Sequence, residues 1–103
     1  MHNAYDFNSL YKAKPNKILL IDVRENKEFS TSAIEGSVSI PLSNLNQESD
    51  LKFIQKESLS KEVFTICKSG QRSEKASRIL YKFKIQSRFV EGGIEKVRKI
   101  LCN

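Results

Sequence analysis

The alternation of short apolar runs with segments of helical periodicity constrains the fold of this chain most strongly. Residues 18–23 are nearly continuous in β-compatible apolar side chains, a pattern typical of a strand that is covered on both faces. Residues 62–67 predict a second buried strand. Shorter strands are expected over residues 37–40 and 87–91, each of which is followed by proline or glycine.

Helical patterns fill the segments between these strands. The clearest is over residues 72–83, where apolar side chains recur at the spacing of one helix face: Ala76, Ile79, Leu80 and Phe83. Further helices are expected over residues 5–12, 25–31, 51–56 and 94–101. Asp6 is a candidate N-cap for the first of them, and Ser49 or Asp50 for the helix over 51–56.

This order of elements predicts an α/β domain with a mainly parallel central sheet of four to five strands and helices on both faces. A length of 103 residues fits a single domain, residues 1–103. In such sheets the functional site lies beyond the carboxyl ends of the strands. The residues expected there are Asp22, Arg24, Pro41, Cys67 and Glu91. Of these, only Cys67 offers a nucleophile.

Charge and apolar content narrow the classes of partner. The net charge of +6, from 18 basic and 12 acidic side chains, favours anionic partners such as small oxyanions or an acidic protein. Nucleic acid is not expected, because the basic residues are spread along the chain without a stripe that also carries aromatic residues. The longest apolar run, residues 18–21, is far shorter than the roughly 20 residues that a membrane span needs.

Histidine and cysteine usage excludes several kinds of site. The only histidine, His2, lies next to the terminus, so a Cys-His pair, a metal site and a bound cofactor are not expected. Two cysteines are too few for a disulfide-rich secreted scaffold. Because residues 1–7 also lack a signal-peptide pattern, a reducing, cytoplasmic location is expected.

The segment between the second buried strand and the amphipathic helix contains the candidate catalytic and anion-binding residues: Cys67, Lys68, Ser69, Gly70, Gln71, Arg72 and Ser73. Backbone N–H groups of a tight turn converge there into an anion-binding nest, and the helix adds its positive end. Lys68, Arg72 and Lys75 add positive charge, and Gly70 permits a curled backbone. These factors favour the thiolate, so we expect a lowered pKa and an activated nucleophile at Cys67. The alternative is a buried cysteine that packs as a small hydrophobe, which the polar surroundings disfavour.

Residues 67–73 resemble the active-site loop of the rhodanese-like sulfurtransferases. Three further segments resemble the same family in the expected order. Residues 20–25 with Glu28 and Phe29 are similar to its N-terminal signature, residues 34–41 to its second strand, and residues 90–94 to its C-terminal glycine motif.

The resemblance implies that Cys67 takes a sulfane sulfur from a small anionic donor such as thiosulfate and holds it as a persulfide. It then passes the sulfur to a thiophilic acceptor, either a thiol or a sulfur-carrier protein. The resemblance also implies that the loop amides, Lys68 and Arg72 hold the anionic donor or the persulfide. Asp22 and Arg24 are expected to brace the loop without reacting.

Three alternatives remain open. Phosphatases and arsenate reductases on a related fold also use a cysteine thiolate, but they place five residues before the arginine, whereas four separate Cys67 from Arg72. Non-catalytic modules of the family typically lose the cysteine. Residues 68–70 and 73–76 also resemble the sulfurtransferase domain fused to adenylyltransferases that load a ubiquitin-like sulfur carrier, so the chain is alternatively such a domain on its own.

Cys102 is the second cysteine of the chain. A tail thiol without a role is the simpler interpretation of it. The alternative is a second thiol that resolves the persulfide on Cys67.

Overall fold

The structure is a computed structural model that describes residues 2–101, and within them the side chains of residues 6–98. The strands are β1 (His2–Asn3), β2 (Ile18–Asp22), β3 (Val38–Ser39), β4 (Glu62–Ile66) and β5 (Arg88–Glu91). The α-helices are α1 (Ala4–Ala13), α2 (Asn26–Thr31), α3 (Glu48–Glu57), α4 (Gln71–Lys82) and α5 (Gly93–Leu101). Two 3₁₀ turns, η1 (Pro15–Lys17) and η2 (Leu42–Asn44), precede β2 and α3.

The strands form one sheet in the order β1-β5-β4-β2-β3, and every pair within the described residues is parallel. The α/β class and the mainly parallel sheet are therefore confirmed. The sequence did not predict β1, because two residues next to the terminus are too short to show any periodicity.

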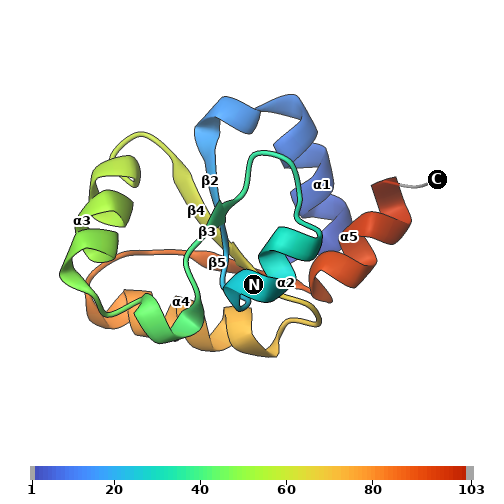
Figure 1. The fold of residues 1–103 in the computed structure, drawn as a ribbon. Helices are drawn as coiled ribbons and strands as arrows, with labels where there is room; N and C mark the ends of the chain where they lie inside the picture. Colours follow the sequence, from blue (N-terminus) through green and yellow to red (C-terminus); the bar gives the residue numbers. More distant parts are fainter. Residues whose placement is uncertain (1, 102–103) are drawn as a thin grey trace.

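Helices cover both faces of the sheet, as expected. Alternate side chains of each strand point to opposite faces. Leu19, Ile21 and Val63 pack with the buried residues of α3 and α4, while Leu20 and Phe64 pack with those of α1 and α5. Figure 1 shows α3 and α4 on one side of the sheet and α1 and α5 on the other.

The predicted N-caps are wrong. Helix α1 begins at Ala4, so that Asp6 lies in its first turn. Helix α3 begins at Glu48 after Gln47, which places Ser49 and Asp50 inside the helix. Acidic side chains in a first turn interact favourably with the positive end of the helix, so they support a helix start two or three residues earlier than a cap at the same residue would.

Phe83 was expected on the buried face of α4 but is 39% exposed, whereas Ala76 and Leu80 are fully buried. The helix ends at Lys82 in a Schellman motif. Lys84 takes a left-handed φ of 63°, and the N–H groups of Lys84 and Ile85 donate to the carbonyls of Tyr81 and Leu80, each at 3.0 Å. Ile85 packs in the core near Leu80 in the place that Phe83 was expected to take.

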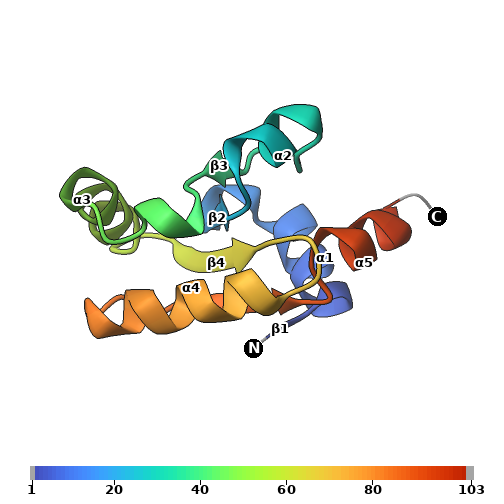
Figure 2. The ribbon, with the colours of Figure 1, turned by 60° about the horizontal axis from the view of Figure 1, so that its bottom comes forward.

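The register of the sheet brings the ends of β2 and β4 together. Asp22 lies opposite Ile66, so Arg24 and Cys67, which follow these strands, lie at the same edge. The loop that leaves β4 reaches the start of α5, where the Ile94 N–H donates to the Cys67 carbonyl at 2.8 Å (Figure 2).

Candidate active site

Cys67 lies directly after β4, at the base of a loop that curls around its sulfur. Backbone N–H groups donate to Sγ from Gly70 at 3.0 Å and from Ser73 at 3.4 Å. The thiol also donates to the Ser73 hydroxyl at 3.5 Å. Gly70 closes the loop with φ of 115°, a left-handed conformation that glycine adopts without strain. The nest of amides expected from the sequence is therefore present.

The surroundings of Cys67 lower the pKa of its thiol. Burial by itself raises the pKa of Cys67, because it disfavours the charged form. The hydrogen bond with the Ser73 side chain and those with the backbone of Ser73, Gly70 and Ser69 outweigh this effect and lower the pKa of Cys67. The thiol is thus activated chiefly by hydrogen-bond donors rather than by neighbouring cations.

The Ser73 side chain lies beside the sulfur and is held in place by hydrogen bonds. Ser73 is fully buried, and its hydroxyl donates to the Gly70 carbonyl at 2.9 Å. The Thr65 hydroxyl, buried in β4, donates to the Ser73 carbonyl at 2.8 Å and lies 3.0 Å from the Ser77 hydroxyl. These bonds tie the first turns of α4 to the strand that carries Cys67, so the donors around Sγ are held by regular structure.

Arg72 does not donate to the sulfur; it forms a two-pronged ion pair with Glu28 on α2. Nη1 donates to Oε1 at 2.7 Å and Nη2 to Oε2 at 3.1 Å. The pair lowers the pKa of Glu28 to about 2 and raises that of Arg72, whose charge also interacts with the Cys67 thiolate. Each side chain is 35% exposed, so the pair lies at the rim of the loop.

The remaining loop side chains are open to solvent. Lys68, Ser69 and Gln71 are exposed. The Lys68 ammonium lies 3.9 Å from the Glu95 carboxylate, with both side chains more than half exposed. Lys68 therefore lies at the rim of the loop and not against Sγ.

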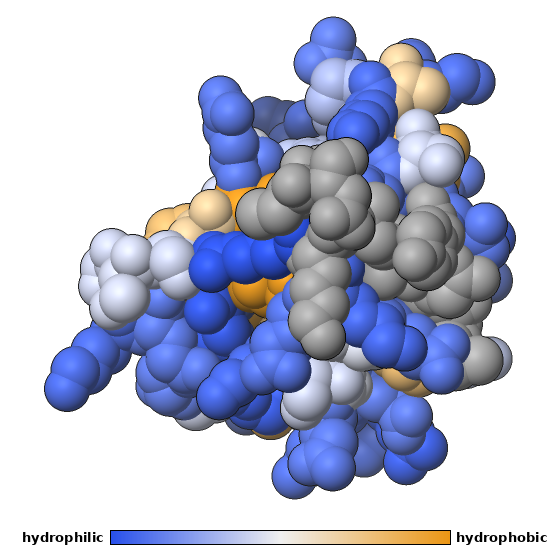
Figure 3. Space-filling view, turned by 90° about the vertical axis from the view of Figure 1, so that its right-hand side faces the viewer, coloured by the Kyte–Doolittle hydropathy of each residue, from blue (hydrophilic) through white to orange (hydrophobic). Residues whose placement is uncertain are grey.

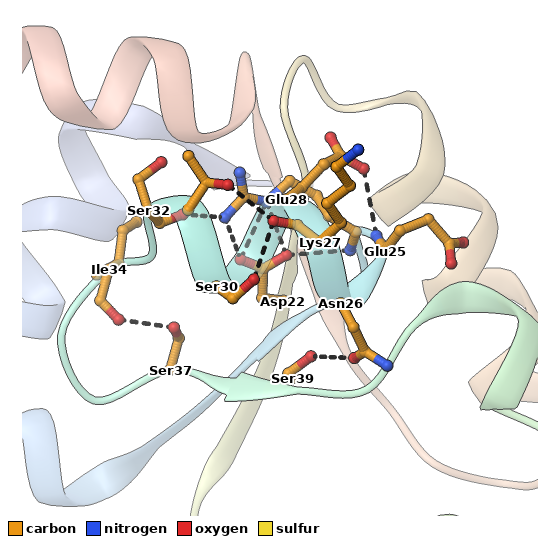
Figure 4. Close-up of polar contacts among 12 residues, drawn as sticks. Asp22, Glu25, Asn26, Lys27, Glu28, Ser30, Ser32, Ile34, Ser37 and Ser39 are labelled. Carbon is orange, nitrogen blue, oxygen red and sulfur yellow. Dashed lines mark hydrogen bonds and ion pairs between the residues drawn. The ribbon is translucent and has the colours of Figure 1, made fainter.

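Asp22 and Arg24 form a buried ion pair at the end of β2. Arg24 Nη2 lies 2.8 Å from Asp22 Oδ2, and the Arg24 backbone N–H donates to Oδ1 at 3.0 Å. Arg24 Nη2 also donates to the Ser32 carbonyl at 2.6 Å, at the end of α2. Figure 4 shows Asp22, Glu28 and Ser32 around this short helix. The pair thus braces α2, the element that carries Glu28.

Two residues of the site were not assigned to it from the sequence. Glu28 appeared only as part of a family signature, and its partner lies 44 positions away. Gly93 appeared only as part of the glycine motif. A Cβ at Gly93 would lie 2.5 Å from the Lys68 carbonyl oxygen, and its φ is 62°. A Glu25-x-x-Glu28 capping-box pattern was the one available sign that Glu28 is held in a fixed position.

Two hollows of the surface lie away from Cys67. One lies between the start of β4, the start of β5 and the end of α4, and the other lies beside α1 and the loop before β3. The face in Figure 3 is mainly hydrophilic with small apolar areas. Cys102 lies outside the described residues, and within them no helix has the length and apolarity to cross a bilayer.

Comparison with known proteins gives one family. Residues 4–100 match the family model of the rhodanese-like domain. The chain is 36% identical over 77 residues to a probable molybdopterin-synthase adenylyltransferase of Gracilaria tenuistipitata var. liui, a match that covers 75% of this chain and 21% of that protein. It is 36% identical over 93 residues to a putative mitochondrial thiosulfate sulfurtransferase of Schizosaccharomyces pombe, covering 78% of this chain and 66% of that protein.

The fold has close counterparts among solved structures. A rhodanese-related protein from Thermoplasma volcanium is 31% identical with a TM-score of 0.76, and the match covers 95% of this chain and 89% of that chain. The chain spans about a fifth of the length of the adenylyltransferase relative and just under two thirds of the sulfurtransferase relative.

Proposed function

This chain belongs to the rhodanese-like domain family, and we propose that it is a sulfurtransferase that carries a sulfane sulfur on Cys67. The observation that supports this most is the set of polar groups around one sulfur atom: two backbone N–H groups donate to Sγ, and the buried Ser73 hydroxyl lies 3.5 Å from it. Such donors stabilise a thiolate and equally a negative sulfur bonded to it.

The first step is attack of the Cys67 thiolate on the outer sulfur of a donor. With thiosulfate, the new bond joins Sγ to that sulfur, the sulfur–sulfur bond of the donor breaks, and sulfite leaves with the bonding electron pair. No net oxidation occurs and no proton is needed. The product is the Cys67 persulfide anion, which the amides of Gly70 and Ser73 are placed to stabilise.

The second step returns the enzyme to its starting state. A thiophilic acceptor such as cyanide or a thiolate attacks the terminal sulfur, and the bond between the two sulfurs breaks. Cys67 leaves as a thiolate. Because its hydrogen-bond donors lower the pKa of Cys67, the cysteine is a good leaving group as well as a good nucleophile.

A sulfur-carrier protein is the second candidate acceptor. The match to a molybdopterin-synthase adenylyltransferase favours it, and so does the net charge of +6, which suits an acidic protein partner. In this version the chain is the sulfur-donor domain of such a system, and the acceptor is a ubiquitin-like carrier. A reducing compartment such as the cytoplasm suits both versions, since the thiol must stay free.

A discontinuous assay with thiosulfate and cyanide tests the proposal. We expect thiocyanate formation, and an added sulfur on the Cys67 peptide by mass spectrometry after treatment with thiosulfate alone. Because only four residues separate Cys67 from Arg72, the loop fits an outer sulfur better than a phosphate ester. Hydrolysis of an aryl phosphate without any persulfide formation would refute sulfurtransfer in favour of phosphatase chemistry.

A further inference from the structure

We propose that Glu28 is a specificity-determining residue that makes doubly charged sulfur donors such as thiosulfate poorer substrates than less charged persulfides of thiols. The inference rests on the proposed sulfurtransferase function. Its basis is that the carboxylate of Glu28 already occupies the guanidinium of Arg72, the cation at the rim of the loop.

Glu28 is held too firmly to move aside without cost. Its Oε1 accepts hydrogen bonds from Arg72 at 2.7 Å and from the Glu25 backbone N–H at 3.2 Å, the latter closing the capping box of α2. The other end of α2 is fixed by Arg24, which donates to the Ser32 carbonyl at 2.6 Å. The carboxylate therefore sits on a short helix that is fastened at both ends (Figure 4).

Two other cations near the loop, Lys68 and Arg24, also face carboxylates. Lys68 lies 3.9 Å from Glu95, and the buried Arg24 is paired with Asp22. A doubly charged donor must therefore displace Glu28 from Arg72 or approach a loop whose nearby cations are already paired with carboxylates. Either route weakens its binding, because like charges repel and a planar two-pronged pair is lost.

A persulfide of an uncharged thiol avoids this cost. The Cys67 thiolate attacks its outer sulfur, the sulfur–sulfur bond of the donor breaks, and the donor leaves as a thiolate with the electron pair. The proton stays on the transferred sulfur, so the charge before and after the step is the same. After the transfer, hydrogen bonds to the sulfur come from the backbone N–H groups of the loop. These N–H groups do not depend on Arg72.

The Glu28→Gln variant tests the inference, because glutamine has the same shape and keeps an oxygen for the Glu25 N–H. We expect the KM for thiosulfate to fall about three- to fivefold, the size expected when a competing, partly exposed ion pair is removed. The KM for the persulfide of 2-mercaptoethanol should stay unchanged. Added salt should reduce the difference in the KM for thiosulfate between Glu28→Gln and the wild type. Glu57→Gln, which removes the same charge from the end of α3, where Glu57 pairs with Lys61, is the matched control.

A binding measurement separates this inference from the proposed function. Sulfate, an unreactive dianion, should protect Cys67 against the uncharged reagent iodoacetamide at about three- to fivefold lower concentration in Glu28→Gln than in the wild type. The double variant Glu28→Gln/Arg72→Ala should return to the wild-type level of protection, since the freed Arg72 guanidinium supplies the gain in Glu28→Gln. Weaker protection in Glu28→Gln, or an equal change for both donors, would overturn the inference. Absence of thiocyanate formation by the wild type with both thiosulfate and the persulfide of 2-mercaptoethanol would overturn the proposed function, while sulfate protection still tests the role of Glu28.

Discussion

Gly93 lies against the backbone carbonyls of Cys67 and Lys68, so closely that a Cβ there would stand 2.5 Å from the Lys68 carbonyl oxygen. The next N–H along, from Ile94, donates to the Cys67 carbonyl at 2.8 Å. The start of α5 thus supports the active loop from behind. The C-terminal glycine motif of the sequence is a packing requirement of the loop that carries the cysteine.

We therefore expect Gly93→Ala to destabilise the protein and to abolish sulfur transfer, because the backbone must shift under Cys67 and the φ of 62° is strained for alanine. Thermal unfolding and the thiosulfate assay measure the two effects. Gly92→Ala is the matched control. Its φ is also left-handed, but the atoms nearest to a Cβ there belong to the flexible Lys96 side chain. Equal losses in both variants would contradict the support argument.

Cys67 is predicted to be the one thiol that sulfur transfer needs. Cys67→Ser should abolish thiocyanate formation, since a serine hydroxyl is not ionised at neutral pH and cannot carry a sulfane sulfur. Cys102→Ser should keep the activity, because nothing in the loop calls for a second thiol. Retained activity in Cys67→Ser, or its loss in Cys102→Ser, would assign the chemistry elsewhere.

The rate of alkylation of Cys67 by iodoacetamide should reach half its plateau below the ordinary cysteine pKa, because the thiolate is favoured. Ser73→Ala should raise this midpoint, since it removes the hydroxyl that lies 3.5 Å from Sγ. Ser69→Ala serves as the control for the midpoint: its contribution comes from the backbone, which alanine keeps. A wild-type midpoint at or above that of a free cysteine would disprove the nest argument.

The pair of Glu28 and Arg72 predicts a specific dependence of stability on pH. The pKa of Glu28 is lowered to about 2 from an ordinary 4.5, so the pair's contribution is complete above pH 4.5 and disappears as the pH falls through 2. Urea unfolding at pH 6 should show Glu28→Gln less stable by about 1 kcal/mol, given the exposure of the pair. The difference from the wild type should shrink between pH 4.5 and 2. Glu48→Gln, which removes a carboxylate from an exposed pair with Lys52, is the control for the loss of a surface charge at pH 6.

Lys84 is the only non-glycine residue with a positive φ in the part of the chain that the structure describes. Because glycine adopts this conformation freely, Lys84→Gly should stabilise the fold by about 1 kcal/mol and raise the melting temperature by a few degrees. Lys82→Gly, two residues earlier and still helical, should instead destabilise by about the same amount. A lower melting temperature for Lys84→Gly would contradict the assignment of a Schellman motif.

The sequence by itself was sufficient to predict the class of the fold, because its signals are local. Alternating side chains in residues 18–23 and 62–67 must reach both faces of a sheet, and the spacing of Ala76 and Leu80 requires a helix over one of them. The nest of amides around Cys67 could also be predicted from the sequence. A strand end, a glycine and the start of a helix lie within seven residues, which leaves few ways to place the backbone N–H groups. The catalytic roles within that loop stay predictions.

What the sequence did not determine depends on contacts between distant segments. Nothing local in Arg72 indicates that its partner is Glu28, 44 positions earlier; the register of β2 against β4 decides it by bringing α2 beside the loop. Because of this register, Arg72, which was expected to hold an anionic donor, forms an ion pair with Glu28. The position of Gly93 behind Cys67 likewise depends on how α5 packs. Ion pairing and close packing act through space, so only the tertiary structure could decide them.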